Sequence, residues 1–241
     1  MTTSPPSTAP GAHSPAPLPP SPLAPPLRSW VRASTLGWLL GIPSIAALAL
    51  LGEALGVGGS QALVGLGMGG AMGWVQGRQA ANHGVPRAAW FFASFLGIGA
   101  PFLGWDVTQR LNLPLEYSLL HLLLIGGVVT GLVQGWLLGA DRAAGRASPA
   151  GNPAPGEATE SVSPPANRAG SPSRAATMAW WTAGCLVGWG AAGWSAGLGD
   201  RLIKTHAVPG LPGAILYLTT VAIGGPVLGL LTGAVLQRIR R

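Results

Sequence analysis

The chain has 241 residues, of which 48% are hydrophobic and 9% are charged. Soluble domains carry about 25% charged residues, so this composition excludes an ordinary soluble domain and predicts lipid as the solvent for much of the chain. The net charge of +7 does not indicate nucleic-acid binding, because the basic residues lie between apolar runs and form no single patch. We therefore expect the lipid bilayer as a partner, and no nucleic acid.

Two segments lack the apolar residues that a packed structure needs. Residues 1–27 are rich in proline with Ser, Thr and Ala, and residues 140–174 are rich in Ser, Pro, Ala and Gly. Such compositions favour disorder. We predict a disordered cytoplasmic tail over 1–27, membrane hairpins over 28–139, a disordered cytoplasmic linker over 140–174, and a third membrane hairpin over 175–241.

Six apolar segments account for the rest of the chain. A bilayer core about 30 Å thick needs about 20 helical residues, and the second and third segments are short for a full span. The predicted helices cover residues 33–55, 61–77, 88–105, 117–139, 175–197 and 214–236. The predicted fold is therefore an all-α integral membrane bundle of six transmembrane helices.

A glycine at every fourth position recurs in the second, fourth and sixth segments. Residues four apart lie on one face of a helix, where glycines let a second helix approach closely. We predict helix packing for nine glycines: Gly69, Gly73, Gly77, Gly127, Gly131, Gly135, Gly225, Gly229 and Gly233. Small-residue faces are common in ordinary membrane bundles, so we favour this structural role over a pore or gate lined by the same glycines.

The first, third and fifth segments share a different signature, in which a tryptophan precedes a glycine by seven residues. The pairs are Trp30 with Gly37, Trp90 with Gly97, and Trp181 with Gly188. Each pair lies on one helix face, because seven residues make about two turns. The chain is thus predicted to repeat one helical hairpin three times, with all three copies entering the membrane from the same side.

The basic residues divide unequally between the two sides that six spans create. Because basic loops resist translocation, the richer side should be cytoplasmic, with both chain ends there in a cell (inner) membrane. That side holds Arg28, Arg32, Arg78, Arg87, Arg142, Arg146, Arg168, Arg174, Arg238, Arg240 and Arg241; the other holds Arg110, Arg201 and Lys204. Interfacial tryptophan belts are predicted near the inner boundary (Trp30, Trp90, Trp136, Trp180, Trp181) and near the outer one (Trp105, Trp194).

Six polar residues could line a path through the bundle: Glu53, Gln76, Asp106, His121, Gln134 and Asp200. The three acids end the odd-numbered segments on the outer side, where a ring of them would attract cations, but solvated carboxylates at helix ends are the favoured interpretation. The amides of Gln76 and Gln134 are expected to bond across helices. His121 is expected to be a hydrogen-bonded interfacial residue rather than a metal ligand or proton relay.

Nothing in the sequence forms a catalytic or metal-binding motif, and Cys185 is expected to pack within its helix. We therefore predict no enzymatic activity, no cofactor and no metal.

The run Gly73-Trp-Val-Gln-Gly77, followed by a polar turn to Arg87 and the Trp90 helix, resembles a pattern in uncharacterised bacterial multi-pass membrane proteins. The resemblance extends loosely over all three hairpins, and it departs at Thr232, which replaces the glutamine, and at Pro226. It implies membrane placement and repetition, and no activity.

The function predicted from the sequence is that of a non-enzymatic structural or interaction bundle, which packs alone or with other membrane proteins. The alternative is a small channel or transporter for an ion or small solute.

Overall fold

The computed structural model describes residues 27–114, 118–147, 172–205 and 210–240, and most of the predicted tail and linker lies outside them. All regular secondary structure in the described residues is helical, which confirms the all-α prediction. The helices are α1 Leu27–Ala54, α2 Gln61–Ala81, α3 Arg87–Arg110, α4 Leu119–Ala147, α5 Arg174–Lys204 and α6 Gly210–Arg240.

The fourth helix is longer than predicted. It continues to Ala147, so residues 140–147, which we assigned to the disordered linker, are helical. The reason is local: this stretch holds four alanines and two arginines, which are among the best helix formers.

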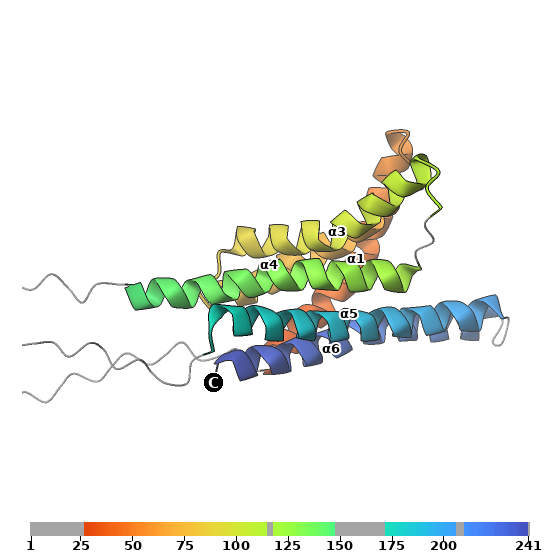
Figure 1. The fold of residues 1–241 in the computed structure, drawn as a ribbon. Coiled ribbons are helices and arrows are strands. Elements are labelled where there is room, and N and C mark those ends of the chain that lie inside the picture. The colour runs from red at the N-terminus through yellow and green to blue at the C-terminus, as the bar shows by residue number, and fades with distance from the viewer. Residues whose placement is uncertain (1–26, 115–117, 148–171, 206–209, 241) are drawn as a thin grey trace, which may run out of the picture.

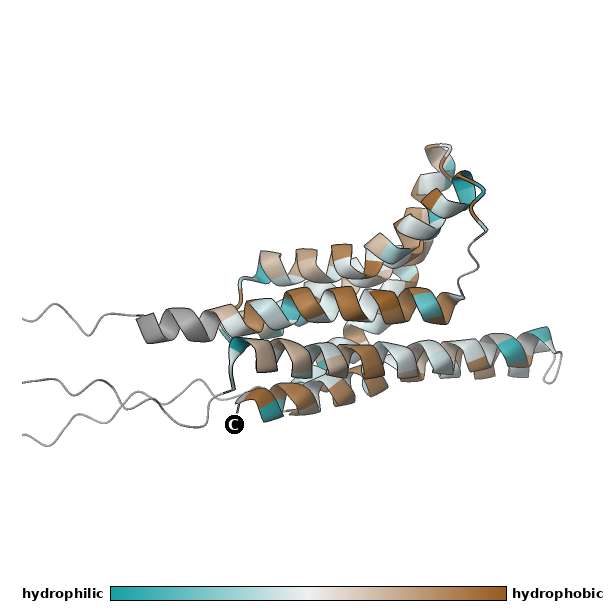
Figure 2. Ribbon diagram, in the orientation of Figure 1, coloured by the Kyte–Doolittle hydropathy of each residue, from teal (hydrophilic) through white to brown (hydrophobic). Residues whose placement is uncertain are grey.

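Four of the six helices are long and apolar enough to cross a membrane: α1, α3, α4 over Leu119–Ala140, and α6 over Gly210–Ile239. The chain therefore has the character of a membrane protein. The other two, α2 and α5, hold only four and five Leu, Ile and Val residues, against thirteen in α6, and are therefore less hydropathic although α6 carries as many glycines. Figure 2 shows the hydrophilic residues mainly towards the helix ends, with apolar stretches between them.

The helices form a closed ring in chain order. Each packs against the helices before and after it in the sequence, and α6 packs against α1. The helices alternate in direction (Figure 1), so the first turns of α1, α3 and α5 share one end of the bundle with the last turns of α2, α4 and α6. In its second half α3 bends away from α5 and α6, close to Pro101, whose ring prevents a straight helix.

The nine triplet glycines are all buried, and they lie where one hairpin meets the next. A Cβ atom on Gly73 of α2 would lie 2.8 Å from the Phe91 carbonyl oxygen of α3. On Gly131 of α4 it would lie 2.7 Å from Thr182 Cα of α5. Backbones that approach this closely have no room for a side chain, so each triplet joins its helix to the tryptophan-bearing helix of the following hairpin.

The third triplet closes the ring. A Cβ atom on Gly229 of α6 would lie 2.9 Å from Val31 Cα of α1. The three junctions between hairpins (α2 with α3, α4 with α5, and α6 with α1) are therefore built in the same way.

Candidate functional site

Three tryptophans meet inside the ring, near the end where their helices begin. They are Trp30, Trp90 and Trp181, and together they form a tryptophan triad. The ring centroids of Trp30, Trp90 and Trp181 lie 5.8, 5.9 and 5.7 Å apart, with interplanar angles of 63–87°. Such edge-to-face contacts are the favoured arrangement of aromatic rings. At most 1% of each side chain is exposed, so the three indoles fill the interior at this level.

The prediction that these three tryptophans lie in an interfacial belt is wrong. The triplet glycines explain their burial, because they leave space beside each indole. A Cβ on Gly233 would lie 2.9 Å from Trp30 Cδ1, and one on Gly135 would lie 3.3 Å from Trp181 Cβ. The neighbouring Trp180, by contrast, is 46% exposed.

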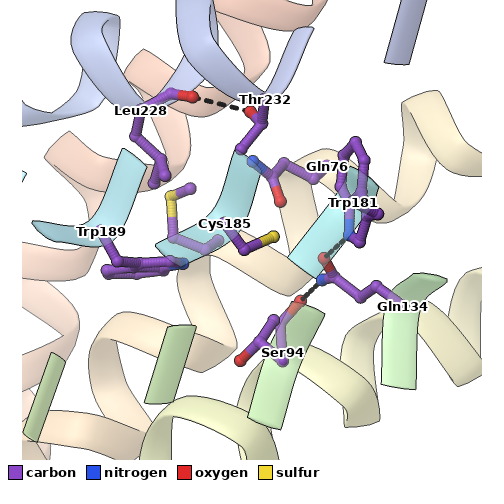
Figure 3. Close-up of a pocket in the computed structure, with 10 residues that line it drawn as sticks. Gln76, Ser94, Gln134, Trp181, Cys185, Trp189, Leu228 and Thr232 are labelled. Carbon is purple, nitrogen blue, oxygen red and sulfur yellow. Dashed lines mark hydrogen bonds between the residues drawn. The ribbon is translucent and has the colours of Figure 1, made fainter. Parts of the chain in front are cut away.

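A glutamine next to the tryptophans connects three helices. The Gln134 amide of α4 donates to Ser94 Oγ of α3 at 2.8 Å, and its oxygen accepts from Trp181 Nε1 of α5 at 3.1 Å. Figure 3 shows both bonds beside the cavity. Since all three residues are buried, each polar group depends on the others for satisfaction.

Related bonds occur in the other hairpins. The Gln76 amide of α2 donates to Ser34 Oγ of α1 at 2.9 Å, and Trp30 Nε1 donates to Thr232 Oγ1 of α6 at 2.9 Å. Trp90 Nε1 is buried and has no hydrogen-bond partner among the described residues. The structure thus places Gln76 and Gln134 as bridges between helices.

These buried glutamine, serine and threonine side chains surround a cavity of about 10 Å³. It is lined by Gln76, Gln134, Ser94, Thr232 and Cys185 among others. A cavity of about 10–15 Å³ is the minimum that holds one water molecule. Beside it, Trp38 and Trp189 lie 5.8 Å apart, eight residues after Trp30 and Trp181 along their helices. The geometry can hold the helices in register through buried hydrogen bonds, and the cavity that the described residues form at this level has room for about one water molecule.

The predicted outer acids have separate environments. Asp106 accepts hydrogen bonds from Ser60 Oγ and from the backbone amides of Gln61 and Ala62, at 2.9 and 2.8 Å for the amides, so it caps the start of α2. Glu53 is exposed in the last turn of α1, and the Asp200 side chain is outside the described residues. Figure 1 shows the ends of α1 and α3 diverging from the end of α5, which carries Asp200, so the structure does not bring the three positions into one ring.

His121 and Cys185 lie apart from each other in the fold. His121 is exposed in the first turn of α4, with Nδ1 3.0 Å from Ser118 Oγ. Cys185 is buried beside the central cavity. No group of three or more metal-binding side chains occurs within the part of the chain that the structure describes.

The two serines that accept hydrogen bonds from the glutamines were not expected from the sequence. Ser34 and Ser94 each lie four residues after a triad tryptophan, and Cys185 lies four residues after the third. Residues at this spacing share a helix face, so the signal was available once the tryptophans were aligned.

No protein-family model, no curated protein and no solved structure matches this chain.

Proposed function

We propose that the chain is a non-enzymatic membrane bundle of six spans, built from three hairpin repeats and closed along its axis. Its role is structural or lies in protein–protein interaction. Its partners are the bilayer and other membrane proteins or further copies of itself, which would contact the outward faces of the helices. The observation that carries the proposal is the packed tryptophan triad, which lies beside a cavity no larger than about one water molecule.

Equivalent contacts in the three hairpins support the repeat. A Cβ on Gly37 would lie 3.0 Å from Met72 Cα, and one on Gly97 would lie 2.9 Å from Thr130 Cα. A Cβ on Gly188 would lie 2.7 Å from Leu228 Cδ1. The three partner residues each precede Gln76, Gln134 or Thr232 by four positions, as expected for copies of one unit. The resemblance to repetitive bacterial multi-pass proteins is part of the same proposal.

The distribution of charge supports a cytoplasmic location for the tryptophan-triad end. Arg28, Arg32, Arg78, Arg87, Arg174 and Arg238 all lie at that end of their helices, whereas Arg110, Arg201 and Lys204 lie at the other. By the positive-inside rule, both chain ends would face the cytoplasm in a cell (inner) membrane.

A channel or transporter remains the second candidate, because amides and hydroxyls line the central cavity. Conduction through it would require the three indoles to separate. The outer acids Glu53, Asp106 and Asp200 would then be the groups that attract cations at the mouth.

Cation flux into liposomes distinguishes the two proposals. We expect liposomes containing the wild-type protein to show no flux above protein-free liposomes, while an added ionophore confirms that they are sealed. Flux above that background, reduced severalfold when Glu53, Asp106 and Asp200 are replaced by their amides, would favour the channel and contradict the closed bundle.

A further inference from the structure

A groove between α3 and α4 opens at the arginine-rich end of the bundle. Its volume is about 360 Å³, and its walls consist of apolar residues from Ala89 to Ala100 of α3 and from Val129 to Leu137 of α4. Half-exposed Trp136 forms part of the wall near the end of the bundle where α3 begins. None of the lining residues is charged.

The length of the groove matches one leaflet of a bilayer. Ala100 lies eleven positions after Ala89, which at 1.5 Å per helical residue is about 16.5 Å. Half of a hydrocarbon core about 30 Å thick is about 15 Å. A single acyl chain that entered from this side of the membrane would therefore lie along the whole groove.

A cation stands at the mouth of the groove. The Arg174 guanidinium lies over the Trp136 ring, with Cζ 4.5 Å from the ring centroid. Arg174 is exposed and forms no ion pair among the described side chains. The acid on the adjoining end of α4, Asp141, has its side chain outside the described residues. The guanidinium lies at headgroup depth, and arginine suits phosphate because its donors form a planar fork.

We propose that the α3/α4 groove binds one acyl chain of an anionic phospholipid whose phosphate is held by Arg174. The arginine over Trp136 distinguishes this groove from a second one, between α1 and α6, which has a volume of about 530 Å³ and is lined by apolar and hydroxyl residues, none of them a tryptophan paired with an arginine. The proposal rests on the membrane placement of the bundle. It does not depend on whether the bundle conducts, because lipid retention is measured independently of flux.

Lipid retention by the purified full-length protein tests the site. We would measure by native mass spectrometry how much phosphatidylglycerol and phosphatidylcholine, with identical acyl chains, remain bound in detergent. The wild type should prefer phosphatidylglycerol, and Arg174→Gln should lower that preference about fivefold, as expected for one basic residue near the surface. Arg174→Lys should retain most of the preference, and Ala100→Trp, which fills the groove, should release both lipids.

Matched variants at the other sites serve as controls. Arg201→Gln removes an arginine from the far end of the same helix, and Ala222→Trp fills the α1/α6 groove; both should retain lipid as the wild type does. Equal retention by Arg174→Gln and the wild type would overturn the proposal, as would displacement of the lipid by millimolar inorganic phosphate, which would indicate a site for free anions. If Ala100→Trp does not fold, the comparison of Arg174→Gln with Arg201→Gln decides the result alone.

Discussion

Replacing Trp181 with alanine is expected to lower the free energy of unfolding in detergent by about 3–5 kcal/mol, the usual cost of truncating a buried aromatic residue. The side chain is 1% exposed and contacts the rings of both Trp30 and Trp90. Its loss also removes the indole donor that satisfies the Gln134 amide oxygen. Thermal or denaturant unfolding, followed by circular dichroism, measures the change.

The adjacent residue provides the control. Trp180 is 46% exposed, and Arg238 lies over its ring with Cζ 4.4 Å from the centroid. Because an exposed cation–π pair contributes about 0.5–1 kcal/mol, Trp180→Ala should cost no more than that. Equal losses for the two alanine variants would show that the triad is not the centre of the core.

The second large effect is expected at Gly131, which lies in the middle of its triplet. Gly131→Leu should lower the free energy of unfolding by about 3 kcal/mol or more, at the upper end of the cost of overpacking. The reason is that the first added carbon would lie 2.7 Å from Thr182 Cα. A backbone atom cannot rotate away as a side chain can, so α4 and α5 must separate. Unfolding curves and the yield of monodisperse protein would report the loss.

Gly104 is the matched position for this substitution. It lies within α3, and a Cβ added there would meet no atom within 4 Å. Gly104→Leu should therefore keep wild-type stability or increase it slightly, since glycine is a poor helix former. If Gly131→Leu unfolds at the same denaturant concentration as Gly104→Leu, the triplets do not set the distance between helices.

The glycine contacts were readable from the sequence because they follow from helix geometry alone. A spacing of four places Gly69, Gly73 and Gly77 on one face in any α-helix, and no tertiary information is needed to expect close packing there. The sequence does not identify the helix that packs against that glycine face. The sequence allows contacts within a hairpin, whereas the structure directs the triplets to the next hairpin.

The tryptophans show where sequence reasoning fails. An indole is both large and apolar and carries an N–H group, so it suits a membrane interface and a buried polar cluster equally well. Trp180 and Trp181 are neighbours in the sequence, yet they have opposite environments because a helix rotates by about 100° per residue. Their burial depends on the glycines of the adjoining helices, which are distant in the chain.

The role of Asp106 as the cap of α2 could not be predicted from the sequence for a similar reason. It caps a helix that begins about 45 residues earlier, and such a long-range bond leaves no local pattern. The prediction of six spans also went beyond what composition supports, since α2 and α5 contain few Leu, Ile and Val residues and are less apolar than α4 and α6, although both belong to the ring.

Closure of the ring by α6 against α1 is the central claim, and intramolecular crosslinking tests it most directly. Thr35 of α1 and Ala222 of α6 line one groove, so a Thr35→Cys, Ala222→Cys protein, made in a Cys185→Ala background, should be joined by a short bismaleimide within a single chain. Thr35→Cys with Val133→Cys, which places the second thiol on α4 across the ring, should not. Absence of the first crosslink, or equal formation of both, would contradict the closed ring.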